Sequence, residues 1–514
     1  MFRFNMTQNQ WLMLLALLSL LATAVLRFHN LDGMLIWHDE IYSISRVFGI
    51  PHQQLFDTVH DGEIHTPSEL LQLQRPQQDD SFEKTLHSLK EHPEHGPLYY
   101  LLGWLVTDWV DKPILALRGT SAVLSLLLFP AIFWLARELW DRRYAWLVLA
   151  LAATSPLYFL YAREARQYAL WFALITAASA ALLRLLRHAS AATYLSYIVL
   201  LILALYTHLM TGLVILAHAL FVILQYYRQP AELLRLAKRL MLAWGCALFC
   251  FVPWLLNIYA QMGQLQKFTG WMSQPTSLAT LVNAWQGHIA HLFVDLPGAE
   301  IFWIPVVILA ALVMVQYFRH ASRSSRMFMG ALVLTYLSFV VLPDLVMSGR
   351  RSVETRYLLP FLLALELICA WAIACGLSSD KAGIRKASFA AFVLILGMGL
   401  TSQYVISEAD SWWTKSLSAE NAGFARLVNA AEKPLIIGSY NSISTGEILS
   451  VAHQLDEHVR ILMENPRKPV TLPSGYSQLF IFSPSAPLRT QLERHYTLVP
   501  YAGSWKWFIA SPLD

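Results

Sequence analysis

Long apolar runs alternate with short polar segments along most of the chain, a pattern that predicts membrane-spanning helices. Eleven of these runs are candidate spans of the hydrocarbon core, which takes about 20 residues to cross. They comprise residues 11–26, 113–135, 144–160, 168–183, 194–206, 209–226, 240–259, 301–318, 327–346, 358–374 and 387–404. The sequence therefore predicts an α-helical polytopic membrane protein with about eleven transmembrane helices.

The first apolar run contains Ala22, Thr23 and Ala24, which together imitate a signal-peptidase site. The run is rather long for a signal core, only Arg3 precedes it, and many spans follow. We therefore interpret it as an uncleaved anchor.

A twelfth apolar segment, residues 97–110, supplies about 14 residues and is too short to span the membrane. If it lies in the membrane interface and the N-terminus is cytoplasmic, the Arg- and Lys-rich loops all fall on the cytoplasmic side. These loops carry Arg137, Arg142, Arg143, Arg184, Arg187, Arg228, Arg235, Lys238, Arg239, Arg319, Arg323, Arg326, Lys381, Arg385 and Lys386. The first loop, residues 28–112, and the C-terminal segment are then predicted to face the periplasm of a bacterial inner membrane.

The segment 405–514 is more polar and predicts a small α/β domain beside a membrane domain of residues 1–404. Buried strands are expected at 434–438 and 479–482, helices at 447–460 and 487–495, and a terminal hairpin at 497–510. The segment has no Gly-rich phosphate fingerprint, so we expect no nucleotide site there.

Composition supports a membrane protein, with 56% hydrophobic and 14% charged residues and a mean hydropathy of +0.45. The net charge of +4 does not indicate nucleic-acid binding. The four cysteines lie in apolar runs without metal-ligand spacing and are interpreted as core or lipid-facing residues. The cluster around His60, Asp61, Glu63 and His65 has no framework typical of zinc, and we expect no metal site there.

Two adjacent carboxylates, Asp39 and Glu40, follow the first span at the predicted membrane surface. Carboxylates at such a place are costly unless they are solvated, paired or used in chemistry. They are the first candidates for catalysis, and capping of an interfacial helix is the alternative.

The same predicted face collects cations, imidazoles and aromatic residues. Arginines are normally scarce in outside loops, so their presence indicates a bound anion, most simply a lipid phosphate. The residues are His95, Tyr99, Tyr100, Arg163, Glu164, Arg166, Tyr168, His208, Arg350, Arg351, Glu354, Arg356 and Tyr357. Structural hydrogen bonding is the alternative for His95 and His208, and an aromatic belt is the alternative for Tyr99 and Tyr100.

Five of these segments, in order, resemble motifs of the GT-C class of membrane glycosyltransferases, such as protein O-mannosyltransferases and lipid A aminoarabinose transferases. They are the Asp39–Glu40 pair, the segment 95–100 with Gly96 in place of a proline, the turn 163–168 with Gln167 in place of a proline, the turn 206–208 and the segment 356–360. The resemblance covers residues 10–405 and is greatest to the branch that acts on bacterial envelope glycans.

The resemblance implies an inverting glycosyltransferase that uses a sugar donor linked to undecaprenyl phosphate or a similar polyprenyl phosphate. Asp39 would act as base with Glu40 beside it, and Arg163, Arg166, Arg356 and His208 would bind the donor phosphate. Substrate contacts would come from His95, Tyr99, Tyr100, Glu164, Tyr168 and Tyr357. The acceptor would be an envelope glycan, a glycolipid or a protein, and this scheme does not require a metal.

Two functions from other classes compete with this hypothesis. A transporter or flippase of lipid-linked sugars should show paired halves and interrupted helices, which the sequence does not show clearly. A non-catalytic envelope sensor would use the C-terminal domain but would leave the outside arginines without a role.

Overall fold

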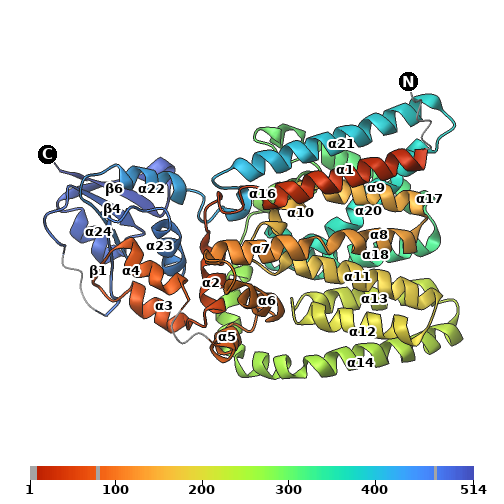
Figure 1. Cartoon of the computed structure of the whole chain (residues 1–514), viewed down its shortest axis with the longest axis horizontal. Coiled ribbons are helices and arrows are strands. Elements are labelled where there is room, and N and C mark those ends of the chain that lie inside the picture. Colours follow the sequence, from red (N-terminus) through yellow and green to blue (C-terminus); the bar gives the residue numbers. More distant parts are fainter. Residues whose placement is uncertain (1–7, 77–80, 468–471, 514) are drawn as a thin grey trace. The chain divides into compact units, whose positions relative to one another are not determined.

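The computed structural model describes residues 8–76, 81–467 and 472–513, and the chain divides into two compact units (Figure 1). The helical unit comprises Met1–His29, His92–Tyr99 and Arg118–Ser407. The mixed unit comprises Asn30–Glu91, Tyr100–Leu117 and Glu408–Asp514. The first polar loop and the C-terminal segment therefore share one unit, a grouping that the sequence did not predict.

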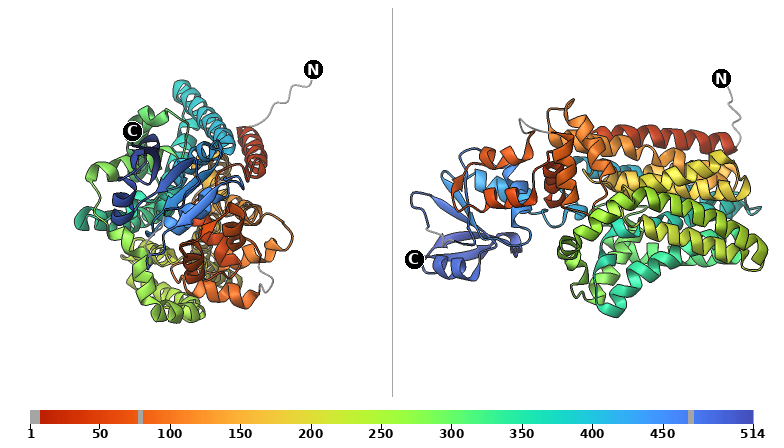
Figure 2. Two further views of the ribbon diagram at one scale, coloured as in Figure 1. Left: turned by 90° about the vertical axis from the view of Figure 1, so that its left-hand side faces the viewer. Right: turned by 90° about the horizontal axis from the view of Figure 1, so that it is seen from below.

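The helical unit is a bundle whose long helices run side by side (Figures 1 and 2). Helices α1, α9, α8, α11, α12 and α14 pack in that order, and α18 joins α13 to α20. The helices are α1 (Gln8–Phe28), α8 (Leu128–Leu139), α9 (Arg142–Thr154), α10 (Pro156–Ala162), α11 (Tyr168–Arg187), α12 (Ala191–Leu205), α13 (Thr211–Tyr226), α14 (Pro230–Ala260), α15 (Met262–Thr269), α16 (Leu278–Ala290), α17 (Trp303–His320), α18 (Arg323–Tyr336), α19 (Leu342–Met347), α20 (Leu359–Leu377) and α21 (Ala382–Glu408). Helix α7 (Pro113–Ser125) connects the two units.

Within the described residues, eight helices are long and apolar enough to cross a membrane, or nine if one bent pair counts as a single span. The bent pair is α9 and α10, which meet at 60°. Two more of the eleven predicted runs form the shorter apolar helices α12 and α13. The polytopic helical fold is confirmed, whereas helix length alone supports fewer than eleven spans. The short segment 97–110 contains the ten-residue helix α6 (Leu98–Thr107).

Proline accounts for the break between α9 and α10. Pro156 is the first residue of α10 and has no backbone N–H, so it cannot continue the hydrogen bonding of α9. Ser155 before it takes an extended conformation, as the residue before a proline prefers. The bend directs α10 into the turn that carries Arg163 and Arg166.

The basic loops gather at one end of the bundle. Arg184 and Arg187 in the last turn of α11 both pair with Glu138 at the end of α8, and Arg323 donates to the carbonyl of Gln225 at the end of α13. Because successive helices alternate in direction, the turns 163–168 and 206–208 and the segment before α20 lie at the opposite end. These three motif segments of the helical unit therefore lie at the end of the bundle away from the basic loops.

The mixed unit contains a six-stranded sheet with the order β1-β3-β2-β4-β6-β5. Strands β2, β3 and β4 are parallel, and β1, β5 and β6 pair antiparallel to their neighbours. The strands are β1 (Ile64–His65), β2 (Pro434–Gly438), β3 (Arg460–Met463), β4 (Gln478–Phe482), β5 (Tyr496–Pro500) and β6 (Trp507–Pro512). The helices are α2 (His38–Val47), α3 (His52–Val59), α4 (Pro67–Leu71), α5 (Phe82–Lys90), α22 (Asn421–Asn429), α23 (Ser444–Ala452) and α24 (Ala486–Leu492).

Alternate residues of the central strands build two cores. On one face, Leu479 and Ile481 pack with Leu488 and Leu492 of α24. On the other, Phe480 and its neighbours meet α22, where Phe424 lies 4.0 Å from Trp507, measured between ring centroids. The continuous apolar runs of β2 and β4 reflect burial on both faces, as is usual for parallel strands.

The predicted strands at 434–438 and 479–482, the helix at 487–495 and the terminal hairpin are confirmed, within a residue or a few at each end. The helix predicted at 447–460 is wrong in its second half. Helix α23 ends at Ala452, and the side chain of Asn429 then bonds the carbonyl of Gln454 and the N–H of Asp456. These bonds replace the helical ones, and the chain continues into β3.

A close helix crossing supplies a test of packing in the helical unit. A Cβ atom placed on Gly399 in α21 would lie 2.3 Å from the carbonyl oxygen of Thr154 in α9. Gly399→Ala should therefore lower the free energy of unfolding by about 1–3 kcal/mol, measured by denaturation in detergent micelles. Gly397→Ala is the matched control, because nothing lies within 4 Å of its Cβ position. Equal stability of the two variants would contradict the crossing.

Candidate functional site

Tyr168 is the centre of a cationic, aromatic cluster at the motif end of the helical unit. The guanidinium carbons of Arg166 and Arg356 each lie 5.7 Å from the centroid of its ring. Tyr168 is the first residue of α11, so the start of this helix brings the turn 163–168 and the segment before α20 together. The face of a tyrosine ring attracts cations, so Tyr168 can hold both guanidinium groups at this place.

His208 completes the cluster from the turn between α12 and α13. Its ring lies 4.6 Å from that of Trp171 and 5.7 Å from that of Tyr168, between centroids. Burial, with further contributions from positively charged Arg166 and Arg356, lowers the pKa of His208 to about 3. The imidazole is therefore neutral at physiological pH, and its Nδ1 accepts a hydrogen bond from the N–H of Met210.

A short backbone pairing joins two of the sequence motifs. His95 and His208 form an isolated antiparallel bridge, and the Leu98 N–H donates to the carbonyl of Tyr206 over 3.0 Å. A Cβ atom on Gly96 would lie 2.4 Å from that carbonyl oxygen, so neither proline nor alanine fits there without movement. The glycine that departs from the motif is thus a consequence of close backbone packing.

The segment that carries Arg356 is fixed from two sides. Asp344, buried in α19, accepts hydrogen bonds from the N–H and hydroxyl of Ser352 at 2.6 and 2.7 Å. His288 of α16 lies 3.0 Å from the Ser352 carbonyl through Nε2 and 2.7 Å from the Thr355 hydroxyl through Nδ1. Arg356 itself pairs with Glu354 at 3.0 Å. These contacts set the place of the guanidinium beside Tyr168.

Arg163 has a different environment from Arg166. Its Nη1 donates to the carbonyls of Leu26, Arg27 and His29 at 2.8, 3.3 and 2.5 Å. A guanidinium at the C-terminus of a helix bonds the last carbonyls and interacts favourably with the helix dipole. Arg163 therefore caps α1, a structural role that the sequence motif did not distinguish from phosphate binding.

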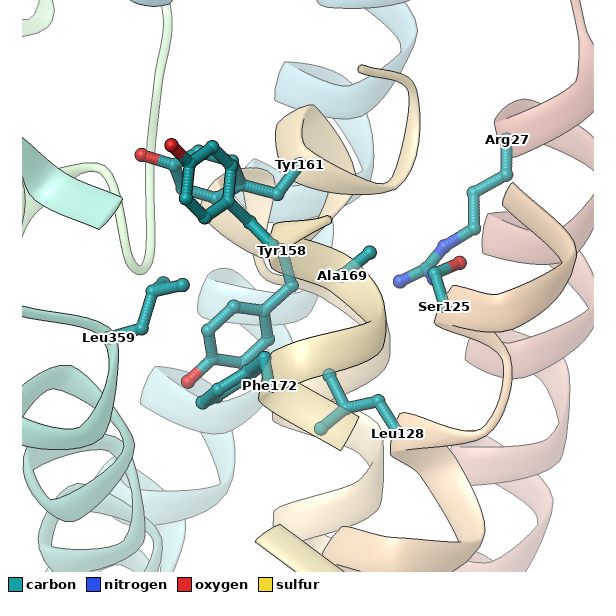
Figure 3. Close-up of a pocket in the computed structure, with 9 residues that line it drawn as sticks. Arg27, Ser125, Leu128, Tyr158, Tyr161, Ala169, Phe172 and Leu359 are labelled. Carbon is teal, nitrogen blue, oxygen red and sulfur yellow. The ribbon is translucent and has the colours of Figure 1, made fainter. Parts of the chain in front are cut away.

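A small pocket adjoins the cluster and shares Tyr168 with it. Figure 3 shows the guanidinium of Arg27 beside the hydroxyl of Ser125, with Tyr158 and Tyr161 on the other side of the pocket. Arg27 is buried, donates to Ser125 and lies over the Phe129 ring. The sequence analysis missed Arg27, because a single arginine at the end of the first span resembles an ordinary flanking charge.

The predicted acidic pair belongs to the mixed unit, at the start of α2. Asp39 is partly exposed, whereas Glu40 is fully buried. The Glu40 carboxylate accepts from the Lys415 ammonium at 2.9 Å and from the Trp37 N–H at 3.4 Å. Farther along α2, burial raises the pKa of Tyr42, with opposing effects of Arg46 and Asp39, so this hydroxyl stays protonated.

The remaining predicted substrate residues divide between the units. In the helical unit, Tyr357 stacks on Trp271 with 6.4 Å between ring centroids, and Glu164 is buried in the arginine turn. Tyr99 is buried and its hydroxyl accepts from Ser121 at 2.9 Å. In the mixed unit, the ring of Tyr100 is buried, and the guanidinium carbon of Arg46 lies 6.0 Å from its centroid.

The structure brings Arg166, Arg356, His208, Tyr168 and Tyr357 together within the helical unit, and His95 joins them through Gln167, whose amide lies 3.2 Å from His95 Nδ1. Gln167 was not predicted as a site residue and occupies the position where the motif has proline. Among the described residues no group of three or more His, Cys, Asp or Glu side chains is arranged to hold a metal ion.

Chemically, the cluster is suited to an anion that has an apolar body. Arginine stays charged at all physiological pH values and can bind two oxygens of a phosphate. The tyrosine and tryptophan faces and the apolar helices favour a hydrophobic chain. Together, the fold and the cluster define the class as polytopic membrane proteins with a buried cluster of arginine and tyrosine that suits an anion.

Comparison with known proteins agrees with this class. The profile of the family described as dolichyl-phosphate-mannose-protein mannosyltransferase matches residues 92–256, less than half of the chain. The structure is similar to that of ArnT from Cupriavidus metallidurans bound to undecaprenyl phosphate, with a TM-score of 0.53, 14% identity and 98% of each chain covered. The apo structure of the same protein matches with a TM-score of 0.52, 13% identity and 97% of each chain covered. A search of curated proteins found no match.

An archaeal oligosaccharyltransferase from Archaeoglobus fulgidus, in its apo form, matches more weakly, with a TM-score of 0.46, 13% identity, and coverage of 89% of this chain and 65% of that chain. The predicted resemblance to the GT-C class is supported, and the chain has the fold of that class. At these identities the comparisons of structures describe the fold alone.

The contact of His288 with the Arg356 segment predicts a pH dependence of stability. Burial lowers the pKa of His288 to about 4, below its value of about 6.5 in an unfolded chain. The unfolded state therefore binds more protons below pH 6.5. The contribution of His288 to the free energy of unfolding is fully present above that pH and is lost as the pH falls toward 4. In detergent, the free energy of unfolding of His288→Asn should depend less steeply on pH between pH 6 and 5 than that of the wild type. The slope should fall by up to about 1.4 kcal/mol per pH unit, which corresponds to about one proton. An unchanged slope would contradict the assignment.

Proposed function

We propose that this protein is an inverting glycosyltransferase that transfers one sugar from a polyprenyl phosphate donor to an acceptor hydroxyl. The observation that carries the proposal is the pair of arginines at the ring of Tyr168, next to a neutral His208, in a protein with the GT-C fold. The crystal structure of ArnT with bound undecaprenyl phosphate supports a bacterial carrier of that type.

In this proposal Arg166 and Arg356 bind the donor phosphate. Charge develops on the phosphate as the bond between the anomeric carbon and the phosphate oxygen breaks, and fixed cations stabilise that charge most in the transition state. Neutral His208, whose Nδ1 accepts from the N–H of Met210, can donate one hydrogen bond through Nε2 without adding a third cation. Tyr168 and Tyr357 offer aromatic faces to the donor, and His95 and Glu164 lie in the segments that surround it.

We assign the base to Asp39. It removes the proton of the acceptor hydroxyl as that oxygen attacks the anomeric carbon, while the lipid phosphate leaves from the opposite face. Asp39 is partly exposed and so accessible to an acceptor, in contrast to Glu40. The proposal requires that Asp39 and the arginine cluster act on the same donor molecule. We further propose that this chemistry takes place on the periplasmic side of a bacterial inner membrane, with an envelope glycan, glycolipid or protein as acceptor.

Replacement of the base tests the proposal most directly. Asp39→Asn should lower kcat by a factor of at least about 10² in membranes reconstituted with an undecaprenyl phosphate sugar, because general-base catalysis contributes 10²–10⁴-fold. Asp32→Asn is the matched control, since Asp32 is an exposed carboxylate of the same loop that pairs with Lys112. Turnover of Asp39→Asn near that of the control would remove Asp39 from the mechanism. Absence of transfer by the wild-type protein with all donors tested would favour a transporter.

The assignment of the donor phosphate to Arg166 and Arg356 predicts a loss of binding affinity. Arg356→Gln and Arg166→Gln should each weaken binding of undecaprenyl phosphate by about tenfold or more, since a hydrogen bond to a charged group contributes about 1.5–3 kcal/mol. Binding can be followed by competition with a fluorescent polyprenyl phosphate. Arg319→Gln, on an exposed residue at the other end of the bundle, should bind normally. Normal binding by both cluster variants would place the phosphate elsewhere.

A further inference from the structure

The segment before and at the start of α2 is held by residues of the C-terminal part of the chain. The N–H of Leu35 donates to the carbonyl of Asp410 at 2.8 Å, and the hydroxyl of Ser450 donates to the carbonyl of Ile36 at 2.6 Å. The N–H of His38 donates to the Ser418 hydroxyl at 3.0 Å. Backbone groups at positions 35, 36 and 38, close to the acidic pair, thus depend on distant parts of the same unit.

Glu40 and Lys415 form the charged part of this attachment. Their side chains are almost fully buried, with 0% and 3% of the side-chain surface exposed, and Nζ lies 2.9 Å from Oε2. The Lys415 ammonium also lies 5.6 Å from the centre of the Trp37 ring. The same Glu40 oxygen faces the N–H of Trp37, which is the N-cap of α2. The ion pair therefore lies directly on the first turn of the helix that carries Asp39.

A second buried carboxylate extends the attachment into the C-terminal sheet. Glu447 at the start of α23 accepts from Ser418, Asn421 and Lys506, and it is completely buried. Its carboxylate lies 3.8 Å from Nδ1 of His38. A Cβ atom on Gly446 would lie 2.4 Å from the same imidazole nitrogen, so the ring of His38 packs directly on the backbone of α23.

We infer that Lys415 is a positioning residue for the reaction, which acts through Glu40 to hold Asp39 in place, and that the C-terminal domain serves as the rigid support of the catalytic turn. This inference rests on the proposed function and divides the acidic pair into two roles. Asp39 is the base, and Glu40 is a structural anion that is engaged by Lys415 and by the N-cap.

The buried ion pair between Glu40 and Lys415 makes the first turn of α2 sensitive to the loss of either charge. Removal of one partner of a buried ion pair leaves an uncompensated charge and is strongly destabilising, whereas removal of both is often close to neutral. Without Lys415, the Glu40 carboxylate loses the cation that lies 2.9 Å from it and would move toward water or take up a proton, and either change disturbs the first turn of α2. A shift of about 1 Å in a catalytic group can lower the rate about 10²-fold. Loss of Lys415 should therefore affect the chemical step more than donor binding.

The test is a charge-removal cycle on the full chain, with Lys415→Met, Glu40→Gln and the double variant, assayed for sugar transfer from undecaprenyl phosphate. Lys415→Met should lower kcat by about tenfold or more with the KM for the donor within about twofold of the wild-type value. The double variant should recover a large part of that loss, and Lys415→Arg should retain most activity. Arg426→Met is the matched control, because its pair with Asp410 in the same unit is exposed.

Hydrogen exchange supplies a readout that does not need activity. The amides of residues 38–41 should exchange faster in Lys415→Met than in Arg426→Met, and the double variant should restore part of the protection. If the wild-type protein transfers no sugar, the proposed function fails, and if Asp39→Asn proves active, the assignment of the base fails, while in both cases this exchange result still stands. If Asp39→Asn is inactive but Lys415→Met transfers sugar and exchanges like wild type, the positioning role is overturned. A variant that fails to fold is replaced by Lys415→Gln and judged by the same exchange measurement.

Discussion

Burial of charge in an apolar protein is the constraint on which the rest of this structure depends. A cation or carboxylate removed from water must find a partner, a dipole or an aromatic face. The helical unit meets this demand with arginines on tyrosine rings and on helix carbonyls. The mixed unit meets it with ion pairs such as Glu40 with Lys415 and Glu447 with Lys506. Arg166 and Arg356 both lie against the ring of Tyr168, and the proposed function assigns the donor phosphate to this pair.

The sequence predicted the helices and strands better than the way in which distant segments pair. Apolar periodicity located the long helices and the buried strands β2 and β4, because both depend on local patterns. It missed β3, whose four residues follow a polar turn, and it could not foresee that β1 from the first loop pairs with β3. Pairing between segments about 400 residues apart leaves no local signal, so the shared unit of loop and C-terminal domain emerges only in three dimensions.

Within the candidate site, the sequence indicated which types of residue gather there but not the role of each residue. Arg163 and Arg166 belong to one motif and differ by three positions, yet one caps α1 and the other flanks Tyr168. Arg163 is the C-cap residue of α10, whereas Arg166 lies two residues before the start of α11, so the two side chains leave different parts of the turn. Likewise Asp39 and Glu40 are adjacent in sequence, but the helical repeat places them on different sides of α2, where one is accessible and the other buried.

The proposed assignment of the base to Asp39, in the mixed unit, has a mechanistic implication. A carboxylate on a short loop helix would by itself be mobile, because a ten-residue helix is only marginally stable alone. Its first turn gains rigidity from buried contacts with α23 and with the segment around Lys415, which are in turn fixed by the sheet. Under the proposed function an acceptor must reach Asp39, so the rigidity of this turn has to come from other contacts of α2. Glu40 supplies such a contact through Lys415 and the N–H of Trp37, which gives the two adjacent carboxylates separate proposed roles.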